Sequence, residues 1–297
     1  MRLEAKFMRD LLWSGSRGLA LAIQPLSEIQ RQGIRALYTF FRISRDTVDK
    51  ASSKSEAIFS TECLVRMFET GDPRSAIDQI PDLGLAWEAW LGLEEEFSVS
   101  RPYALEFARG LQLEASGYLP NANEDVLRFC YQTGGVLGLI AGEVLSAPES
   151  AVQSFVDAGS AARLEGLANT VDADAKIFRS FIPIGAPMRY RQLVSILYSS
   201  ARDAFPRLSF RVRIACSLAL VVIRERESTF LRRGDRVVDE FLRQTGSALW
   251  QKIRVRDLSA PSAAKTAQIR DASLALRNQT YRFSRELVVK PSPKHLE

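Results

Sequence analysis

Two short acidic segments hold the residue types in this sequence that suit metal or diphosphate chemistry. Asp46 and Asp49 form the first, and Asp172 and Asp174 form the second. Asp46 and Asp49 are three residues apart in a stretch of helical periodicity, a spacing that places both side chains on one helix face. Such a pair suits Mg²⁺, which prefers hard oxygen ligands and commonly also binds a substrate's phosphates. Acidic pairs at this spacing are also common on solvated surfaces, so the spacing alone leaves both interpretations open.

The surroundings of the first pair favour a ligand role. Asp46 and Asp49 end a long predicted helix and follow Tyr38, two phenylalanines and Arg42, which make an aromatic and cationic environment. Histidine chemistry has little room, because the only histidine in the sequence, His295, lies in a tail rich in proline and lysine. We therefore expect carboxylates and arginines to carry the chemistry.

The net charge of the chain indicates which classes of partner it can bind. The 297 residues carry a net charge of +5 and an isoelectric point near 9.2. Such a surplus suits phosphorylated ligands or an anionic membrane surface, but it also arises from arginines on solvated helix faces. The basic residues are scattered singly and lack the clustered stripe and aromatic platforms of nucleic-acid-binding proteins, so no nucleic-acid partner is expected.

Neither a transmembrane segment nor a secretory signal is predicted. No apolar run approaches the roughly 20 residues that a transmembrane helix needs, although contact with a membrane surface is left open. The first ten residues include Glu4, Lys6, Arg9 and Asp10, and no apolar signal core follows them. The three cysteines lie far apart without metal-ligand spacing and are expected to be free thiols, which is typical of a cytoplasmic protein.

Helical periodicity runs along nearly the whole chain, and alternating strand patterns are rare. Glycine and proline mark the breaks between helices, as at Gly71-Asp72-Pro73. The sequence therefore predicts one all-α domain over residues 1–289 and a disordered tail at 290–297. The predicted helices span 26–49, 56–69, 86–96, 103–113, 123–145, 151–178, 190–204, 209–233 and 235–250, and a last helix ends near residue 287.

The segment Ser16-Arg17-Gly18-Leu19 near the N-terminus is followed by Tyr38, Arg42 and Asp49. This part of the chain resembles the opening of the squalene/phytoene synthase family, in which a segment of the type S-[RK]-S-F stands at the position of Ser16 to Leu19. Tyr38 and Arg42 then correspond to a family tyrosine and arginine that run into the first Asp-rich motif, D-x-x-x-D, which Asp49 closes.

Three later segments resemble the same family in the same order. Gly110 to Glu114, Tyr118 and Phe129 to Gly138 are similar to its G-M-x-x-D…Y…Y-C-Y-x-x-A-G-x-V-G pattern. Ala158 to Pro183 is similar to its second Asp-rich segment, which ends R-x-Y-L-P where this chain has Arg-Ser-Phe-Ile-Pro. Together the matches cover most of residues 16–183.

The resemblance implies an isoprenoid-synthase-type helical bundle around a central cavity, in which two Asp-rich motifs hold Mg²⁺ and ionise a prenyl diphosphate. By position, it implies that the metal ligands and catalytic residues are Asp46, Asp49 and Asp174. Arginines would bind the diphosphate, and aromatic rings would shelter a carbocation. The implied substrate-binding residues are Arg17, Tyr38, Arg42, Arg45, Tyr118, Tyr131, Arg163, Thr170, Arg179 and Phe181.

Both Asp-rich motifs depart from the family pattern. Arg45 stands at the leading Asp of the first motif, and Thr170 stands at the leading Asp of the second. Arg163 replaces an upstream Gln on the same helix face, where Asp174 is the carboxylate that is kept, while Asp172 is expected on a solvated face. The arginines at 45 and 163 can hold diphosphate directly through their guanidinium forks, which would relieve one or more metals.

These departures leave three functions open. The first, which we favour from the sequence, is a prenyltransferase that ionises one allylic diphosphate with Mg²⁺ and transfers the prenyl group to an aromatic acceptor. An electron-rich ring needs no second ionisation, so such an enzyme tolerates a reduced metal apparatus. The second is head-to-head condensation of two prenyl diphosphates, as in squalene and phytoene synthases. The third is a non-catalytic relative that acts as an assembly factor.

Overall fold

The computed structural model describes residues 3–118, 120, 123–176 and 187–225, and at positions 123, 170–176, 187–189 and 224–225 it describes the backbone alone. Within these ranges the chain is helical and has no strand, which confirms the predicted all-α class. The elements are α1 (Ala5–Gly15), α2 (Arg17–Ala22), α3 (Glu28–Asp49), α4 (Lys54–Thr70), α5 (Arg74–Gln79), α6 (Asp82–Phe97), α7 (Arg101–Ser116), α8 (Asn123–Cys130), the π-helical turn η1 (Tyr131–Gly135), α9 (Val136–Val144), α10 (Glu149–Lys176), α11 (Pro187–Arg202), the 3₁₀ turn η2 (Phe205–Arg207) and α12 (Phe210–Glu225).

The longer helices follow the sequence prediction to within a few residues. The predicted helix at 123–145 is a continuous run of α8, η1 and α9, in which the π-helical turn is the unpredicted feature. Helices α1, α2 and α5 were not predicted; α2 and α5 have six residues each, too few to show a helical period. The helices expected beyond residue 225 and the tail at 290–297 lie outside the described residues.

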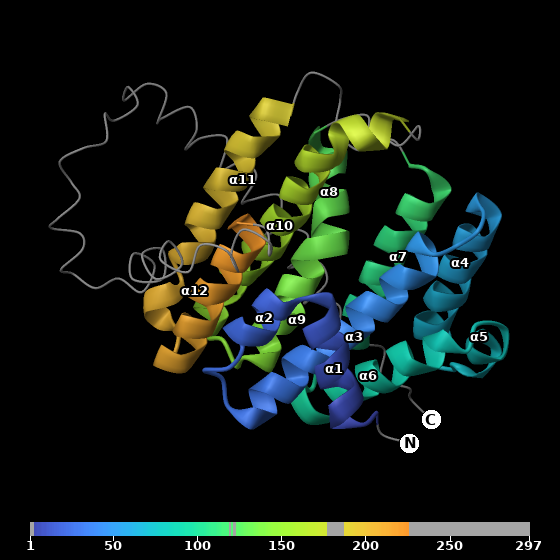
Figure 1. Ribbon diagram of the computed structural model, residues 1–297, viewed down its shortest axis with the longest axis horizontal. Coiled ribbons are helices and arrows are strands. Elements are labelled where there is room, and N and C mark those ends of the chain that lie inside the picture. Colours follow the sequence, from blue (N-terminus) through green and yellow to red (C-terminus); the bar gives the residue numbers. More distant parts are fainter. Residues whose placement is uncertain (1–2, 119, 121–122, 177–186, 226–297) are drawn as a thin grey trace, which may run out of the picture.

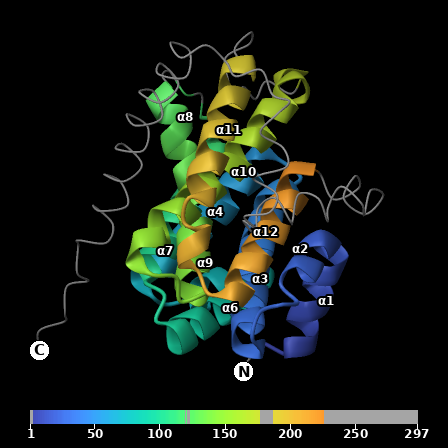
Figure 2. The ribbon, with the colours of Figure 1, turned by 90° about the vertical axis from the view of Figure 1, so that its left-hand side faces the viewer.

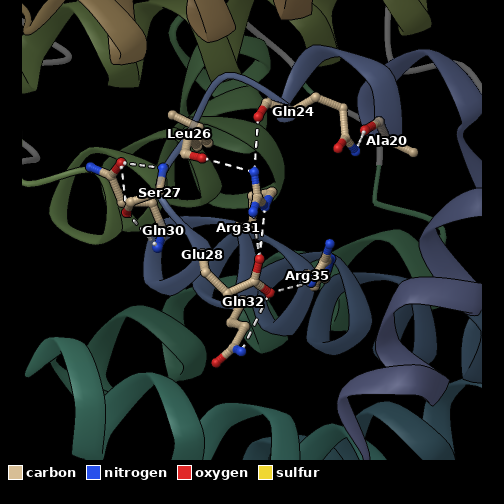
Figure 3. A network of polar contacts seen from close by, with 9 residues as sticks. All are labelled: Ala20, Gln24, Leu26, Ser27, Glu28, Gln30, Arg31, Gln32 and Arg35. Atoms are coloured by element: carbon tan, nitrogen blue, oxygen red, sulfur yellow. Dashed lines mark hydrogen bonds and ion pairs between the residues drawn. The ribbon is translucent and has the colours of Figure 1, made fainter.

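Helix α3 runs through the middle of the bundle, and polar contacts fix its first turn (Figure 3). The Ser27 hydroxyl accepts from the Gln30 N–H, and Gln30 Oε1 accepts from the Ser27 N–H, both at 3.3 Å, which is a complete capping box. Gln30 also donates through Nε2 to the carbonyl of Leu145 at 3.2 Å, so the start of α3 is tied to the end of α9. Arg31 donates to two carbonyls of the preceding loop at 2.9 and 3.0 Å. These contacts set the angle at which α3 enters the bundle.

The first half of the bundle packs around aromatic residues of α3. The Phe40 ring, which is fully buried, lies 5.7 Å from Phe68 of α4, 5.1 Å from Trp90 of α6 and 5.5 Å from Phe107 of α7, measured between ring centroids. Such tilted and edge-on pairs each contribute about 0.5–1.5 kcal/mol beyond burial. Helices α3, α4, α6 and α7 are therefore held as one unit.

The second half is built on close contact between η1, α9 and α10. A Cβ atom added at Gly134 or Gly159 would overlap the other glycine's carbonyl oxygen, and one added at Gly138 would overlap the carbonyl of Phe155. Only glycine permits backbones to approach this closely. Helix α10 therefore packs closely against η1 and α9, which contain the Gly-rich segment that resembles the family pattern.

The flank opposite α4 and α7 is covered by segments from the two ends of the described chain (Figures 1 and 2). Helix α11 packs along α10, and α12 packs beside α2. None of the described helices combines the length and apolar composition that crossing a bilayer requires.

Candidate functional site

A cavity of about 490 Å³ lies between α2, α3, the η1–α9 run, α10 and α12. This volume is within the range of roughly 300–1,000 Å³ that is typical of small-molecule sites. Arg45 and Arg163 are the only charged side chains among the described residues that line it. The aromatic lining residues are Tyr38, Phe41, Phe155 and Phe205, and most of the rest are Leu, Ile, Ala or Gly.

Small residues at helical spacing create the empty space. Gly134, Gly138 and Ala141 from the η1–α9 run face Ala158 and Ala162 of α10 across one side of the cavity. Residues three or four apart share a helix face, so each run presents a strip without bulky side chains. This spacing is visible in the sequence and is a signal that our sequence analysis did not use.

An ion-pair triad joins three helices at the arginine part of the cavity lining. Glu114 of α7 accepts from Arg45 of α3 through both oxygens, at 2.9 Å from Nη2 and 3.1 Å from Nη1. Its Oε2 also accepts from Nη2 of Arg163 of α10 at 2.8 Å. Glu114 is 5 % exposed, whereas the Arg45 and Arg163 side chains are 21 % and 17 % exposed and reach the cavity. We call these three residues the Arg45–Glu114–Arg163 triad.

The contacts of the triad favour the charged forms of Glu114 and Arg45. Burial raises the pKa of the Glu114 carboxyl, but attraction by Arg163 and Arg45 and their hydrogen bonds outweigh burial, and the pKa ends below its ordinary value. For Arg45, burial lowers the pKa, while Glu114 and then Asp49 raise it, with a net rise. Two arginines around one carboxylate leave the triad with a surplus positive charge next to an apolar cavity.

Arg163 is oriented by two further contacts. Its Nε donates to the Thr133 hydroxyl at 3.2 Å, and that hydroxyl donates to the carbonyl of Phe129 at 2.7 Å. The Arg163 guanidinium carbon lies 5.2 Å from the centre of the Phe129 ring, in the range of a cation–π contact. The guanidinium is thus held by a carboxylate, a hydroxyl and a ring.

The predicted metal ligands of the first motif are paired with basic side chains. Asp46 Oδ1 lies 2.9 Å from Arg42 Nε, and its Oδ2 lies 2.8 Å from Lys50 Nζ. Asp49 Oδ2 lies 3.2 Å from Arg45 Nε. Each described carboxylate at this end is therefore already neutralised within the chain.

These carboxylates do not fit a Mg²⁺ site as they stand. Mg²⁺ needs oxygen ligands in near-octahedral geometry, and here three cationic groups already contact three of the four carboxylate oxygens of Asp46 and Asp49. The described residues contain no group of three or more His, Cys, Asp or Glu side chains that could hold a metal ion. The metal role of Asp174 stays a prediction, because only its backbone, on α10, is described.

The other predicted site residues divide into those at the cavity and those away from it. Tyr38 lines the cavity, whereas Arg17 and Arg42 are exposed and lie outside its lining. Tyr118 is half-buried outside the lining, where burial and then Asp125 raise its pKa. Tyr131 is buried in η1, also outside the lining.

The remaining predicted site residues lie at positions whose side chains the structure does not describe. Thr170 and Asp172 have only their backbones described, on α10, and Arg179 and Phe181 lie outside the described residues. Glu114 is the residue that the sequence analysis missed. It occupies the position of the closing Asp in the family pattern G-M-x-x-D, a signal that could have drawn attention to it.

Comparison with known proteins places the chain in a family. A sequence model described as squalene/phytoene synthase matches residues 13–184, more than half of the chain and nearly the segment in which the motifs were recognised. The chain belongs to the squalene/phytoene synthase family. The resemblance stated from the sequence is thereby confirmed.

The relatives that match this chain in sequence are distant. The chain is 25 % identical over 174 residues to a phytoene synthase of Pseudescherichia vulneris, covering 57 % of this chain and 56 % of that protein. It is 22 % identical over 174 residues to a 15-cis-phytoene synthase of Enterobacter agglomerans, covering 57 % and 58 %. The chain thus spans just over half the length of the curated relatives it matches.

Solved structures of the squalene/phytoene synthase family share the fold. A dehydrosqualene synthase bound to a ligand aligns with a TM-score of 0.65 at 18 % identity, covering 83 % of this chain and 96 % of that one. A squalene synthase from Alicyclobacillus acidocaldarius aligns with a TM-score of 0.60 at 13 % identity, covering 77 % and 94 %. The predicted isoprenoid-synthase-type helical bundle is therefore confirmed.

Proposed function

We propose that this chain binds prenyl diphosphates in its apolar cavity and joins two of them head to head into a hydrocarbon. The observation that carries the proposal is the cavity itself, an almost wholly apolar space whose only described charged lining residues are Arg45 and Arg163. The names of the relatives favour this reaction over the transfer to an aromatic acceptor that we preferred from the sequence. Nothing in the comparisons supports an aromatic acceptor.

In this proposal the apolar lining binds the prenyl chain. Removing apolar surface from water contributes about 25 cal/mol for each Å², so a long prenyl chain gains most of its affinity from this lining. Tyr38, Phe41, Phe155 and Phe205 line the cavity, where aromatic rings would stabilise a carbocation and the apolar lining would limit the approach of water.

The two arginines account for the diphosphate. Their fixed guanidinium groups would stabilise the charge that develops on the leaving diphosphate as its C–O bond breaks. In the complete reaction both diphosphates leave with their electron pairs, the two prenyl chains become bonded carbon to carbon, and two protons pass to the released diphosphates. The atoms balance without a reductant.

The test is a product assay on the purified chain. Geranylgeranyl or farnesyl diphosphate is supplied with and without Mg²⁺, and we expect a hydrocarbon together with two diphosphates for each molecule formed. Diphosphate release that occurs only when an aromatic acceptor such as a hydroxycarbazole is added would assign the acceptor reaction instead. Absence of both hydrocarbon and diphosphate would point to the non-catalytic alternative and overturn the proposal.

A further inference from the structure

We propose that Arg45 and Arg163 form a diphosphate-binding site that works without a divalent metal. The inference rests on the proposed function for its ligand, a prenyl diphosphate, but not on the condensation step. It concerns how the head group is held, and it extends the expectation that Arg45 and Arg163 relieve one or more metals to a head group held without any metal.

The charges beside the cavity favour an anionic ligand. The Arg45–Glu114–Arg163 triad carries two positive charges and one negative charge, and the negative member is the most buried. Asp49 also pairs with Arg45, but it is 44 % exposed, so water and salt screen its charge. Arg45 and Arg163 are the charged side chains of the described cavity lining, so an anionic group in the cavity meets positive charge first.

The two arginines also supply hydrogen-bond donors. Arg45 uses its Nε on Asp49 and one hydrogen each of Nη1 and Nη2 on Glu114. Arg163 uses its Nε on Thr133 and one hydrogen of Nη2 on Glu114. A guanidinium has five N–H groups, so contacts with the described residues leave N–H groups on both arginines for a ligand. Their fork geometry matches phosphate oxygens.

Binding of a metal ion to the carboxylates that pair with these arginines would be energetically unfavourable. For Mg²⁺ to use Asp46, Glu114 or Oδ2 of Asp49, ion pairs of those carboxylates with Arg42, Lys50, Arg45 or Arg163 would have to break. The dication would then stand beside the released guanidinium groups, a strongly unfavourable arrangement at low dielectric. A diphosphate that binds the arginines directly keeps these ion pairs and adds further attraction. The carboxylates whose side chains the structure describes therefore favour direct binding.

The two guanidinium groups are preorganised. Glu114 and Thr133 hold the Arg163 guanidinium from two sides, and Glu114 holds Arg45 through both of its oxygens. Side chains that are already ordered lose less entropy when the ligand binds. The site is built on three helices, α3, α7 and α10, rather than on loops.

Calorimetric titration of the full chain with farnesyl thiodiphosphate, an analogue that resists ionisation, tests the proposal. We expect the Kd in EDTA to lie within about threefold of the Kd in Mg²⁺, because guanidinium groups supply the head-group contacts. Arg45→Met and Arg163→Met should each weaken binding by about tenfold to a hundredfold in EDTA, as charge-assisted hydrogen bonds are lost. Arg109→Met, on the exposed Arg109–Glu69 pair of α7 and α4, should leave the Kd unchanged.

Farnesol separates head-group recognition from structural damage. This alcohol carries the same chain without the diphosphate, so its affinity should be the same in the wild type and in the Arg45 and Arg163 variants. A parallel loss of farnesol binding would mean that the arginines only support the cavity wall, which would overturn the proposal.

The outcomes distinguish this inference from the proposed function. Binding of the thiodiphosphate that requires Mg²⁺ overturns the metal-free site and leaves head-to-head condensation standing. Binding in EDTA without hydrocarbon formation from geranylgeranyl diphosphate supports the site and overturns the condensation. Absence of binding in both EDTA and Mg²⁺ overturns both.

Discussion

Replacing Glu114 by glutamine removes the only negative charge of the Arg45–Glu114–Arg163 triad while keeping the size of the side chain. In the native protein this carboxylate accepts three charge-assisted hydrogen bonds, two from Arg45 and one from Arg163, at 2.8–3.1 Å. The glutamine carbonyl can still accept from one guanidinium, but its amide N–H groups would face the other. We therefore expect Glu114→Gln to destabilise the fold.

The burial of the residue sets the magnitude. Glu114 is 5 % exposed, so water cannot replace the lost partner of the two guanidinium groups. Removing one member of a buried ion pair costs about 3–5 kcal/mol. Because one hydrogen bond can survive, we expect a loss of about 3 kcal/mol in the free energy of unfolding. In a domain of this size that corresponds to a fall of roughly 6–12 °C in melting temperature.

The pH dependence of the loss has a defined sign. The pKa of Glu114 is lowered on folding, so its contribution to stability is complete above the unfolded pKa of about 4.5 and is lost as pH falls through the lower folded pKa. Glutamine does not titrate. The difference in unfolding free energy between wild type and variant should therefore be largest near neutral pH and should shrink in acid.

Urea unfolding followed by circular dichroism measures this difference, and Glu69→Gln is the matched control. Glu69 pairs with Arg109 of α7 at 2.9 Å, but both side chains are about half exposed, so its loss should cost less than about 1 kcal/mol. A Glu114→Gln loss no larger than the control, or a loss that grows towards acid pH, would refute the reasoning.

Three further perturbations follow from the structure. Gly134→Ala should lower the free energy of unfolding by about 1–3 kcal/mol in urea titrations, because the added Cβ would overlap a backbone carbonyl of α10. Gly92→Ala is the control: its Cβ would meet open space, and the substitution should raise the free energy of unfolding by up to about 1 kcal/mol. Ala158→Phe fills the cavity and should weaken farnesol binding by at least about tenfold in calorimetry, while Ala5→Phe on the exposed face of α1 should not change it. Burial raises the pKa of Glu143 from 4.5 to about 7, so folding disfavours its charged form and stability should decline as pH rises through this interval. Glu143→Gln should abolish that decline in unfolding titrations, and a slope that persists in the variant would contradict the assignment.

Helix type and position were predictable because they depend on contacts within a few residues of the chain. The apolar period of 26–49 predicted α3, and the capping box at Ser27 and Gln30 moved its start by only two residues. Gly71 ends α4 in the left-handed region with a φ of 69°, as the Gly71-Asp72-Pro73 break in the sequence indicated, and Gly117 ends α7 in the same way with a φ of 76°. The π-helical turn η1 was not predicted, because its five residues are too few to show a period of their own.

By itself the sequence determined that this protein is a helical member of the squalene/phytoene synthase family, and that residues 45 and 163 are arginines where the family has Asp and Gln. Only the tertiary structure decided what those arginines contact. The partner of both is Glu114, which lies 69 residues from Arg45 and 49 residues from Arg163 along the chain. Local periodicity carries no information about such pairings, because they depend on how α3, α7 and α10 pack. The acidic pair at Asp46 and Asp49, which suggested a metal site, is neutralised by Arg42, Lys50 and Arg45, and the charge that faces the cavity is positive.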